Sequence, residues 1–314
     1  MTSKYHLDQI ESIILKNTDR YMAHEEIAPL VANLCEDKEF LFDAIREYIT
    51  KSGQVCPERL AMPLLSSGDI MVFINLFCPI RDGGKNISFD NIHHHGWRLL
   101  TTGVCSGDGY EAIEFIKKSH HDRDGNSVKL RVDEIFTHTK GPTRFLDSHK
   151  AHVVFHPKET TATLAVWSAD RRIATQKLKR MLEPYESMRA FLVKTAMFFG
   201  LEKILGLNVT KGLYYHPEGG NIIETHDYKL EFDGEDAEIL ACWFVFYQQI
   251  GFNDQDFWSK VKKTASPESI IYIDQLLKGD TIADLGIWGN MRRRFSKTQI
   301  LQAIDNSLLG DSNY

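Results

Sequence analysis

Three consecutive histidines, His93, His94 and His95, bring metal-ligating side chains together at one point of the sequence. An apolar run follows them, which is typical of a β-strand. Because side chains alternate along a strand, His93 and His95 share one face and His94 takes the other. Two imidazoles on one wall of a barrel can begin a metal site, and His152 further along offers a third ligand. The alternative is a solvated histidine cluster at a turn.

Other histidines compete for these roles. His149 lies three residues before His152 and replaces it as third ligand if the strand begins earlier. We favour His152 because Val153 and Val154 are the better strand formers. His94 is expected to point away from the barrel interior and to have a structural role.

A second metal motif is present between two strand-like runs. His120 and Asp122 form an H-x-D element, for which Arg171 could supply an acid-binding cation, as in a 2-oxoglutarate oxygenase. The lysines, arginine and glycine around it favour an exposed hairpin tip instead.

A substrate pocket inside the barrel also needs hydrogen-bond donors or a cation. We predict Tyr110 and Arg144 as the catalytic side chains, and Glu111 as an acceptor that could orient a ligand histidine. Arg98 is a further cation, but strand alternation counts against it, because Leu99 and not Arg98 shares the parity of His95.

Composition excludes several classes of function. The 314 residues are 43% hydrophobic and carry 37 Lys and Arg against 43 Asp and Glu, a net charge of −6, so nucleic acid is not an expected partner. The five cysteines are scattered without a C-x-x-C pair, which indicates free thiols in a reducing compartment. Without a signal-like N-terminus or a membrane-spanning apolar run, we expect a soluble cytoplasmic protein without membrane contact.

The elements that must position these residues fall into three segments. Residues 1–58 show apolar residues at helical spacing. Residues 59–170 contain successive strand-like runs separated by tight turns, which predicts an antiparallel β-barrel. Residues 171–314 return to a helical pattern, with helices at 173–182 and 185–205 and a hairpin or covering loop at 212–232. The expected fold is α+β, with a mainly β core and helical extensions at both ends.

With the strands placed, the H-x-H pair and His152 resemble the metal site of the cupin superfamily, whose core is an antiparallel double-stranded β-helix. Its first motif carries H-x-H, a strand and a glycine turn, matched here by His93, His95 and Gly107. Its second motif places a third histidine at the start of a hairpin strand, as at His152. The likeness covers roughly residues 65–170 and is most similar to the cysteine dioxygenase and thiol dioxygenase branch.

One departure from the common cupin pattern affects the expected metal. Most metal-binding cupins have a glutamate shortly after the second histidine, but residues 96–100 contain no carboxylate. The resemblance therefore implies three neutral imidazoles, as in thiol dioxygenases, which leave the ion its full charge and open positions for substrate and oxygen. We expect Fe²⁺, with Zn²⁺, Mn²⁺ and Ni²⁺ as alternatives.

The resulting expectation is a cupin-type iron(II) oxygenase or dioxygenase acting on a small polar molecule and O₂. Two alternatives remain open. The same barrel could carry non-redox chemistry, as an isomerase or hydrolase with zinc or manganese. It could also be a non-catalytic ligand-binding protein whose helical tail forms a homodimer or partner interface.

Overall fold

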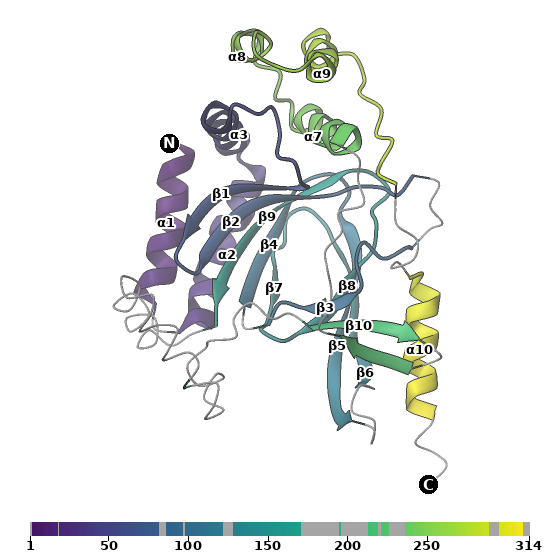
Figure 1. Ribbon diagram of the computed structural model, residues 1–314. Helices are drawn as coiled ribbons and strands as arrows, with labels where there is room; N and C mark the ends of the chain where they lie inside the picture. The colour runs from purple at the N-terminus through teal and green to yellow at the C-terminus, as the bar shows by residue number, and fades with distance from the viewer. Residues whose placement is uncertain are drawn as a thin grey trace.

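The computed structural model describes residues 2–17, 19–81, 86–96, 98–121, 128–170, 195, 213–218, 221–225, 236–288 and 295–309. Within them, two antiparallel β-sheets face each other and helices cover their outer faces (Figure 1). The predicted fold class, a mainly β core with helical extensions at both ends, is confirmed. The division of the chain into three segments as domains stays a prediction.

The first sheet has five strands, in the spatial order β1-β2-β9-β4-β7. Their bounds are Ala61–Ser67 for β1, Ile70–Phe77 for β2, Thr161–Ala169 for β9, Arg98–Ser106 for β4 and Arg144–Leu146 for β7. Side chains alternate along β2, so that Val72 and Ile74 enter the core beneath the helices while Phe73, Asn75 and Phe77 line a cavity on the other face. The inner face of this sheet is therefore available to a ligand.

The second sheet has six strands, in the spatial order β11-β10-β3-β8-β5-β6. Their bounds are Asn221–Thr225 for β11, Leu213–Glu218 for β10, Ile92–His94 for β3, Ala151–Val154 for β8, Tyr110–His121 for β5 and Val128–His138 for β6. On the outer face, Ile113 and Val153 pack in one core cluster with Ile300 of helix α10, which spans Lys297–Leu309. The β10–β11 hairpin confirms one of the two structures expected for residues 212–232.

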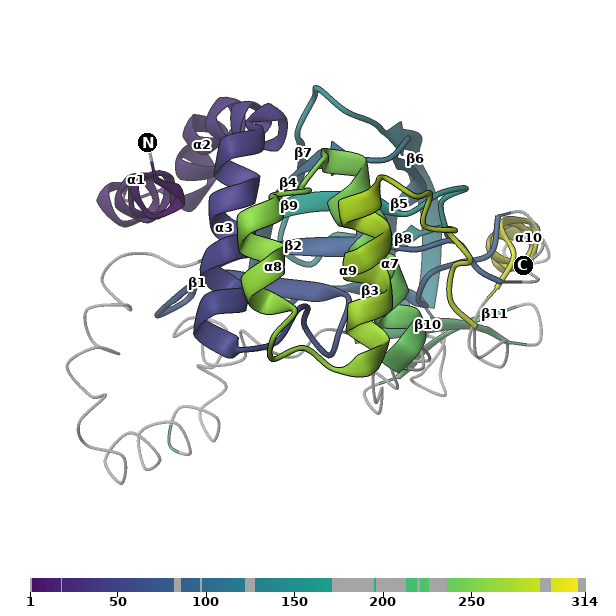
Figure 2. The ribbon, with the colours of Figure 1, turned by 90° about the horizontal axis from the view of Figure 1, so that it is seen from above.

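Other helices of the described residues cover the five-stranded sheet. They are α1 (Ser3–Lys16), α2 (Arg20–Glu36), α3 (Lys38–Ser52), α7 (Asp236–Ile250), α8 (Gln255–Val261) and α9 (Pro267–Lys278). Seen from above, α3, α8 and α9 lie over the strands of that sheet (Figure 2). The apolar stripe Leu7, Ile10 and Ile14 is buried against it, as helical spacing predicts.

Some features expected from the sequence lie outside the described residues, and others can be compared with the structure. The helices expected at 173–182 and 185–205 lie outside the described residues, apart from Thr195, which is helical. The short strand β7, which carries Arg144, had no counterpart in the sequence analysis. All five cysteines are free thiols. No described helix is long and apolar enough to cross a membrane.

Candidate metal centre

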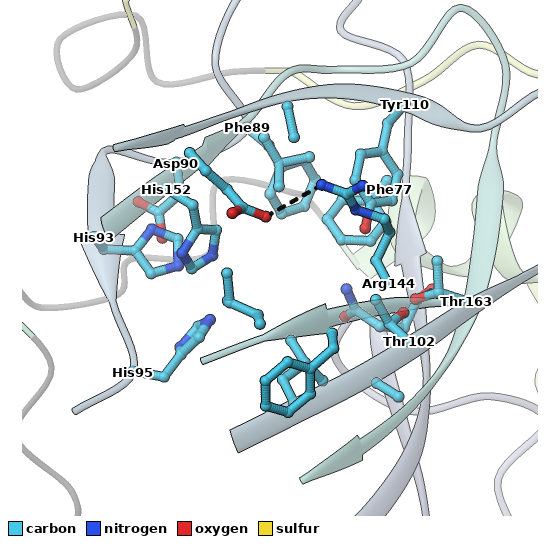
Figure 3. Close-up of a pocket in the computed structure, with 18 of the residues that line it drawn as sticks. Phe77, Phe89, Asp90, His93, His95, Thr102, Tyr110, Arg144, His152 and Thr163 are labelled. Atoms are coloured by element: carbon cyan, nitrogen blue, oxygen red, sulfur yellow. Dashed lines mark hydrogen bonds and ion pairs between the residues drawn. The ribbon is translucent and has the colours of Figure 1, made fainter. Parts of the chain in front are cut away.

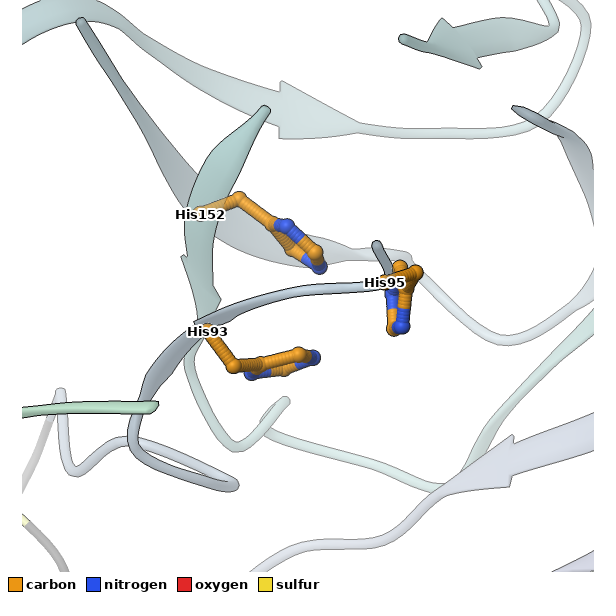
Figure 4. A group of neighbouring side chains, drawn as sticks. All are labelled: His93, His95 and His152. Atoms are coloured by element: carbon orange, nitrogen blue, oxygen red, sulfur yellow. The ribbon is translucent and has the colours of Figure 1, made fainter. Parts of the chain in front are cut away.

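The three predicted histidines come together at the inner face of the six-stranded sheet (Figure 4). His93 in β3 pairs across the ladder with His152 in β8, and His95 follows the end of β3. The ring centroid of His93 is 4.8 Å from that of His95 and 4.4 Å from that of His152. One ligand nitrogen from each imidazole lies within 4.8 Å of the others. The predicted grouping of these side chains is confirmed.

Main-chain carbonyls fix the orientation of two of the rings. Nδ1 of His93 is 2.8 Å from the carbonyl oxygen of Asn91, and Nδ1 of His152 is 3.1 Å from that of Lys150. A carbonyl oxygen can only accept a hydrogen bond, so each Nδ1 must carry the proton and donate it. In the neutral form of such a ring, Nε2 carries the lone pair that can bind a metal, an arrangement common in metal sites.

Burial keeps the site in the protonation state that a metal needs. Removal from water lowers the pKa of His95 and of His152 well below the ordinary histidine value, and the imidazole of His93 beside them lowers both further. Both rings are therefore neutral at pH 7. Within the described part of the chain, the cluster contains three nitrogens and no carboxylate. This donor set fits a divalent transition-metal ion after small ring rotations, since nitrogens on one tetrahedral ion stand roughly 3.4 Å apart.

A cavity of about 190 Å³ adjoins the three imidazoles between the two sheets. Figure 3 places His93, His95 and His152 at one end and Thr102, Thr163, Tyr110 and Phe77 across the cavity from them. The walls are mainly aromatic and aliphatic, formed by Phe73, Phe77, Phe89, Leu100, Ala112, Phe136, Phe145, Leu146, Val154, Ala165 and Trp167. Such a lining limits contact with water and strengthens the few polar contacts within it.

Tyr110, predicted as catalytic, lines this cavity from the first position of β5. Its hydroxyl lies 3.0 Å from Nδ1 of His138 at the end of β6. Burial raises the pKa of Tyr110 and lowers the pKa of His138 to about 4. At neutral pH the pair is thus a protonated phenol and an uncharged imidazole, which holds the hydroxyl in place for a hydrogen bond to a bound molecule.

Arg144, the second predicted catalytic residue, also lines the cavity, but its charge is already balanced. Its guanidinium forms ion pairs with Glu134 at 2.7 Å and Glu114 at 3.5 Å, and lies 3.6 Å from the ring centroid of Phe136. These contacts fix Arg144 at the wall of the cavity. They leave it as a hydrogen-bond donor rather than an uncompensated positive charge.

Sequence reasoning missed Glu114. This residue lines the cavity from β5, opposite His152 in the β5–β8 ladder, and also lies 3.7 Å from Lys150. Burial raises the pKa of its carboxyl group, although the neighbouring cations oppose the shift. Strand alternation from Tyr110 could have identified it, because residues 110, 112 and 114 share one face of β5.

Glu111, the acceptor expected from the sequence, has a different role. Its side chain lies on the face of β5 opposite to that of Tyr110. Its carboxylate pairs with Lys297 of α10. The ligand histidines are oriented by carbonyl oxygens instead, as described above. A main-chain acceptor has no sequence signature, so this could not be found by inspecting side chains.

Strand alternation predicts that residues 99 and 101 lie on the same face as His95, and this was wrong beyond Gly96. Leu100 and Thr102 line the cavity, whereas Thr101 faces helix α2. Gly96 has φ +64, and the chain leaves the six-stranded sheet there to enter β4 of the other sheet, so alternation does not carry across it. Arg98 does not reach the cavity lining and instead lies 5.2 Å from the ring centroid of Trp167.

The competing ligands are not brought into the cluster. His149 has φ +58 and its ring lies 5.1 Å from that of His94, outside the group of three. In the H-x-D alternative, Asp122 and Arg171 lie outside the described residues. The main chain of the neighbouring His121 pairs with Val128 at the end of the β5–β6 ladder.

No family model matches the chain, and no curated protein matches it. Similar solved structures include a conserved protein with a double-stranded β-helix domain from Klebsiella pneumoniae, at 13% identity, 41% of this chain, 89% of that chain and a TM-score of 0.25. A cupin protein from Bacteroides fragilis is 15% identical over 36% of this chain and 80% of that chain, with a TM-score of 0.24. A putative mannose-6-phosphate isomerase from Ralstonia eutropha is 14% identical over 37% of this chain and 89% of that chain, with a TM-score of 0.23. These scores are too low to carry a functional conclusion, which must rest on the site itself.

Proposed function

We propose that the protein is a metal-dependent oxygenase or dioxygenase that acts on a small molecule bound in the cavity. The observation that supports this best is the convergence of three imidazoles, those of His93, His95 and His152, at one end of a largely apolar cavity. A bound iron(II) ion would supply redox chemistry with O₂ there, because three uncharged ligands leave it its full charge and vacant positions.

The chain's own residues prepare the site for this chemistry. The carbonyls of Asn91 and Lys150 hold two ligand rings in one tautomer, so little reorganisation is needed when an ion binds. The aromatic walls keep bulk water from the bound molecule. Tyr110, held by His138, can form a hydrogen bond with it, while Arg144 keeps the carboxylate of Glu114 in position.

One observation favours a second function, non-redox catalysis with zinc or manganese as a Lewis acid. The carboxyl group of Glu114 lies in the same cavity, opposite His152 in the ladder, and its pKa is raised by burial. A carboxyl group of this kind is suited to take up and return a proton during hydrolysis or isomerisation. Dependence on O₂ separates the two functions.

Metal content measured by elemental mass spectrometry tests the proposal. Untagged wild-type protein, prepared with and without air, is compared with His93→Ala and His152→Ala. The matched control is His149→Asn, because asparagine tolerates the positive φ of that position while removing the nearby imidazole outside the cluster. We expect near-stoichiometric iron in wild type and control, and loss of it in both ligand variants.

An oxygen electrode then distinguishes the two functions with the same samples. Substrate-dependent O₂ uptake by the iron-loaded protein supports the oxygenase. Zinc or manganese at full occupancy, with turnover that continues without O₂, favours the Lewis-acid enzyme. Absence of metal from every preparation, or metal retained by both ligand variants, contradicts the site.

A further inference from the structure

We infer that the cavity binds a compound built on a single aromatic ring, with an anionic metal-binding group at one end and a neutral hydrogen-bonding substituent at the other. The metal end of this inference rests on the proposed function. The size, the walls and the far end rest on the cavity alone.

The volume sets the size of the bound molecule. The cavity measures about 190 Å³. An apolar protein cavity of about 150 Å³ accommodates benzene. The remaining space of roughly 40 Å³ suits one or two small substituents on the ring.

Aromatic side chains line the path from the metal end to the far end. The Trp167 ring centroid is 4.3 Å from that of His95 and 5.8 Å from that of Phe73. At the other end, the Phe77 ring centroid is 4.4 Å from that of Tyr110. Rings arranged in this way offer edge and face contacts that favour another aromatic ring over a flexible polar chain.

The far end offers neutral polar groups. Thr102, Thr163 and the hydroxyl of Tyr110 lie across the cavity from His93 and His152 (Figure 3). In the described part of the chain, Arg144 is the cationic side chain of the lining, and two carboxylates already balance it. A second anion on the ligand would therefore meet no uncompensated positive charge, whereas a hydroxyl or amide group would find donors and acceptors.

Four probes test this inference by binding and not by turnover. The protein is loaded with cobalt(II), whose visible spectrum reports ligands that enter its coordination positions, and titrated with 4-hydroxybenzoate, benzoate, terephthalate and acetate. We expect 4-hydroxybenzoate to bind at least 100-fold tighter than acetate and at least 10-fold tighter than terephthalate. Equal affinities for the aromatic acids and acetate would overturn the inference.

Two variants locate the binding. Ala165→Phe fills the cavity from β9 without changing a histidine, and we expect it to retain cobalt and acetate but to bind 4-hydroxybenzoate at least 100-fold more weakly. Thr163→Val removes one hydroxyl at nearly constant size, so 4-hydroxybenzoate should bind about 10-fold more weakly and benzoate equally well. If neither variant changes these affinities, the ring does not lie in this cavity.

The experiment distinguishes a protein that binds no metal from one whose cavity does not bind an aromatic ring. If the wild-type protein binds no cobalt(II), the proposed function fails. Calorimetry with the same probes then decides the aromatic cavity by itself. Tighter binding of benzoate than of acetate supports it, and equal binding overturns it.

Discussion

At the scale of single residues, the site depends on side chains held by fixed partners. His93 and His152 are oriented by carbonyl oxygens of their own strands, two residues before each of them. Tyr110 is oriented by His138, which belongs to the neighbouring strand. The contacts of the two histidines with carbonyl oxygens form within one segment of the chain. The contact between Tyr110 and His138 depends on the register between β5 and β6.

Tyr110→Phe tests the contact between Tyr110 and His138. The change keeps the ring but leaves Nδ1 of His138 without its partner, so we expect a loss of about 1–2 kcal/mol of stability. Turnover should fall roughly 10- to 100-fold if the hydroxyl contacts the substrate, with metal content unchanged. Steady-state kinetics and urea unfolding measure the two effects.

The matched control is Tyr247→Phe. Its hydroxyl is likewise buried and donates to the carbonyl of Val55, but it lies in helix α7, away from the cavity. This variant should lose similar stability and keep wild-type turnover. Equal turnover in both variants would show that the Tyr110 hydroxyl has a structural role only.

At the scale of elements, a buried histidine joins helix α2 to the five-stranded sheet. Nδ1 of His24 is 2.8 Å from the hydroxyl of Thr101 in β4, and Nε2 is 2.9 Å from that of Ser168 in β9. Burial lowers the pKa of His24 to about 3, with a further contribution from Arg20. The imidazole therefore remains neutral in the folded protein at any moderate pH.

His24 should make stability depend on pH. The unfolded chain takes up a proton near pH 6.5 and the folded chain only near pH 3, so stability falls as the pH drops through this interval. Between pH 7 and pH 5 this one group should cost about 2 kcal/mol. Urea unfolding of wild type and His24→Gln at both pH values measures it. A variant that loses as much stability as wild type on acidification would contradict the assignment.

A glycine immediately before β5 lies against the main chain of His138, the residue that holds Tyr110. Gly109 has φ +92, and a Cβ atom there would lie 1.9 Å from the carbonyl oxygen of His138. Gly109→Ala should therefore cost several kcal/mol and displace the tyrosine. In Gly141→Ala, where φ is +99 but no atom lies within 4 Å, only the backbone strain of about 1–2 kcal/mol is expected. Similar urea midpoints for the two variants would contradict this close approach.

At the scale of the whole molecule, the helices and the cavity use opposite faces of the same strands. One core cluster joins α1–α3 and α7–α9 to the outer face of the five-stranded sheet, and the other joins α10 to the six-stranded sheet. The inner faces are left to line the cavity. Residues of the site can thus be changed without removing the main apolar contacts of the fold.

Metal removal should lower the stability of the whole protein. An ion that binds only the folded state stabilises it by about 2.7 kcal/mol at a free concentration 100 times its Kd. For a chain of this size that corresponds to roughly 5 °C in Tm. We expect a chelator to lower the Tm of wild type by this amount and to leave the His93→Ala, His152→Ala double variant unchanged. An equal shift in both proteins would place the ion elsewhere.

The sequence by itself determined the features that depend only on residues close together in the chain. Helical stripes such as Leu7, Ile10 and Ile14 and the alternation within β2 follow from the periods of helix and strand, and the structure confirms them. The H-x-H spacing likewise places His93 and His95 on one side. The addition of His152 came from a resemblance and from strand propensity, and the β3–β8 pairing places this residue beside His93.

Only the tertiary structure decided what surrounds the three histidines. The turn at Gly96 moves the chain between sheets and reverses the parity expected for β4. Glu114 faces His152, and His138 holds Tyr110, because of registers between strands that are separate in sequence. Strand pairing is non-local and a shift of one residue would turn these side chains away from the cavity. No local window of the sequence contains that information.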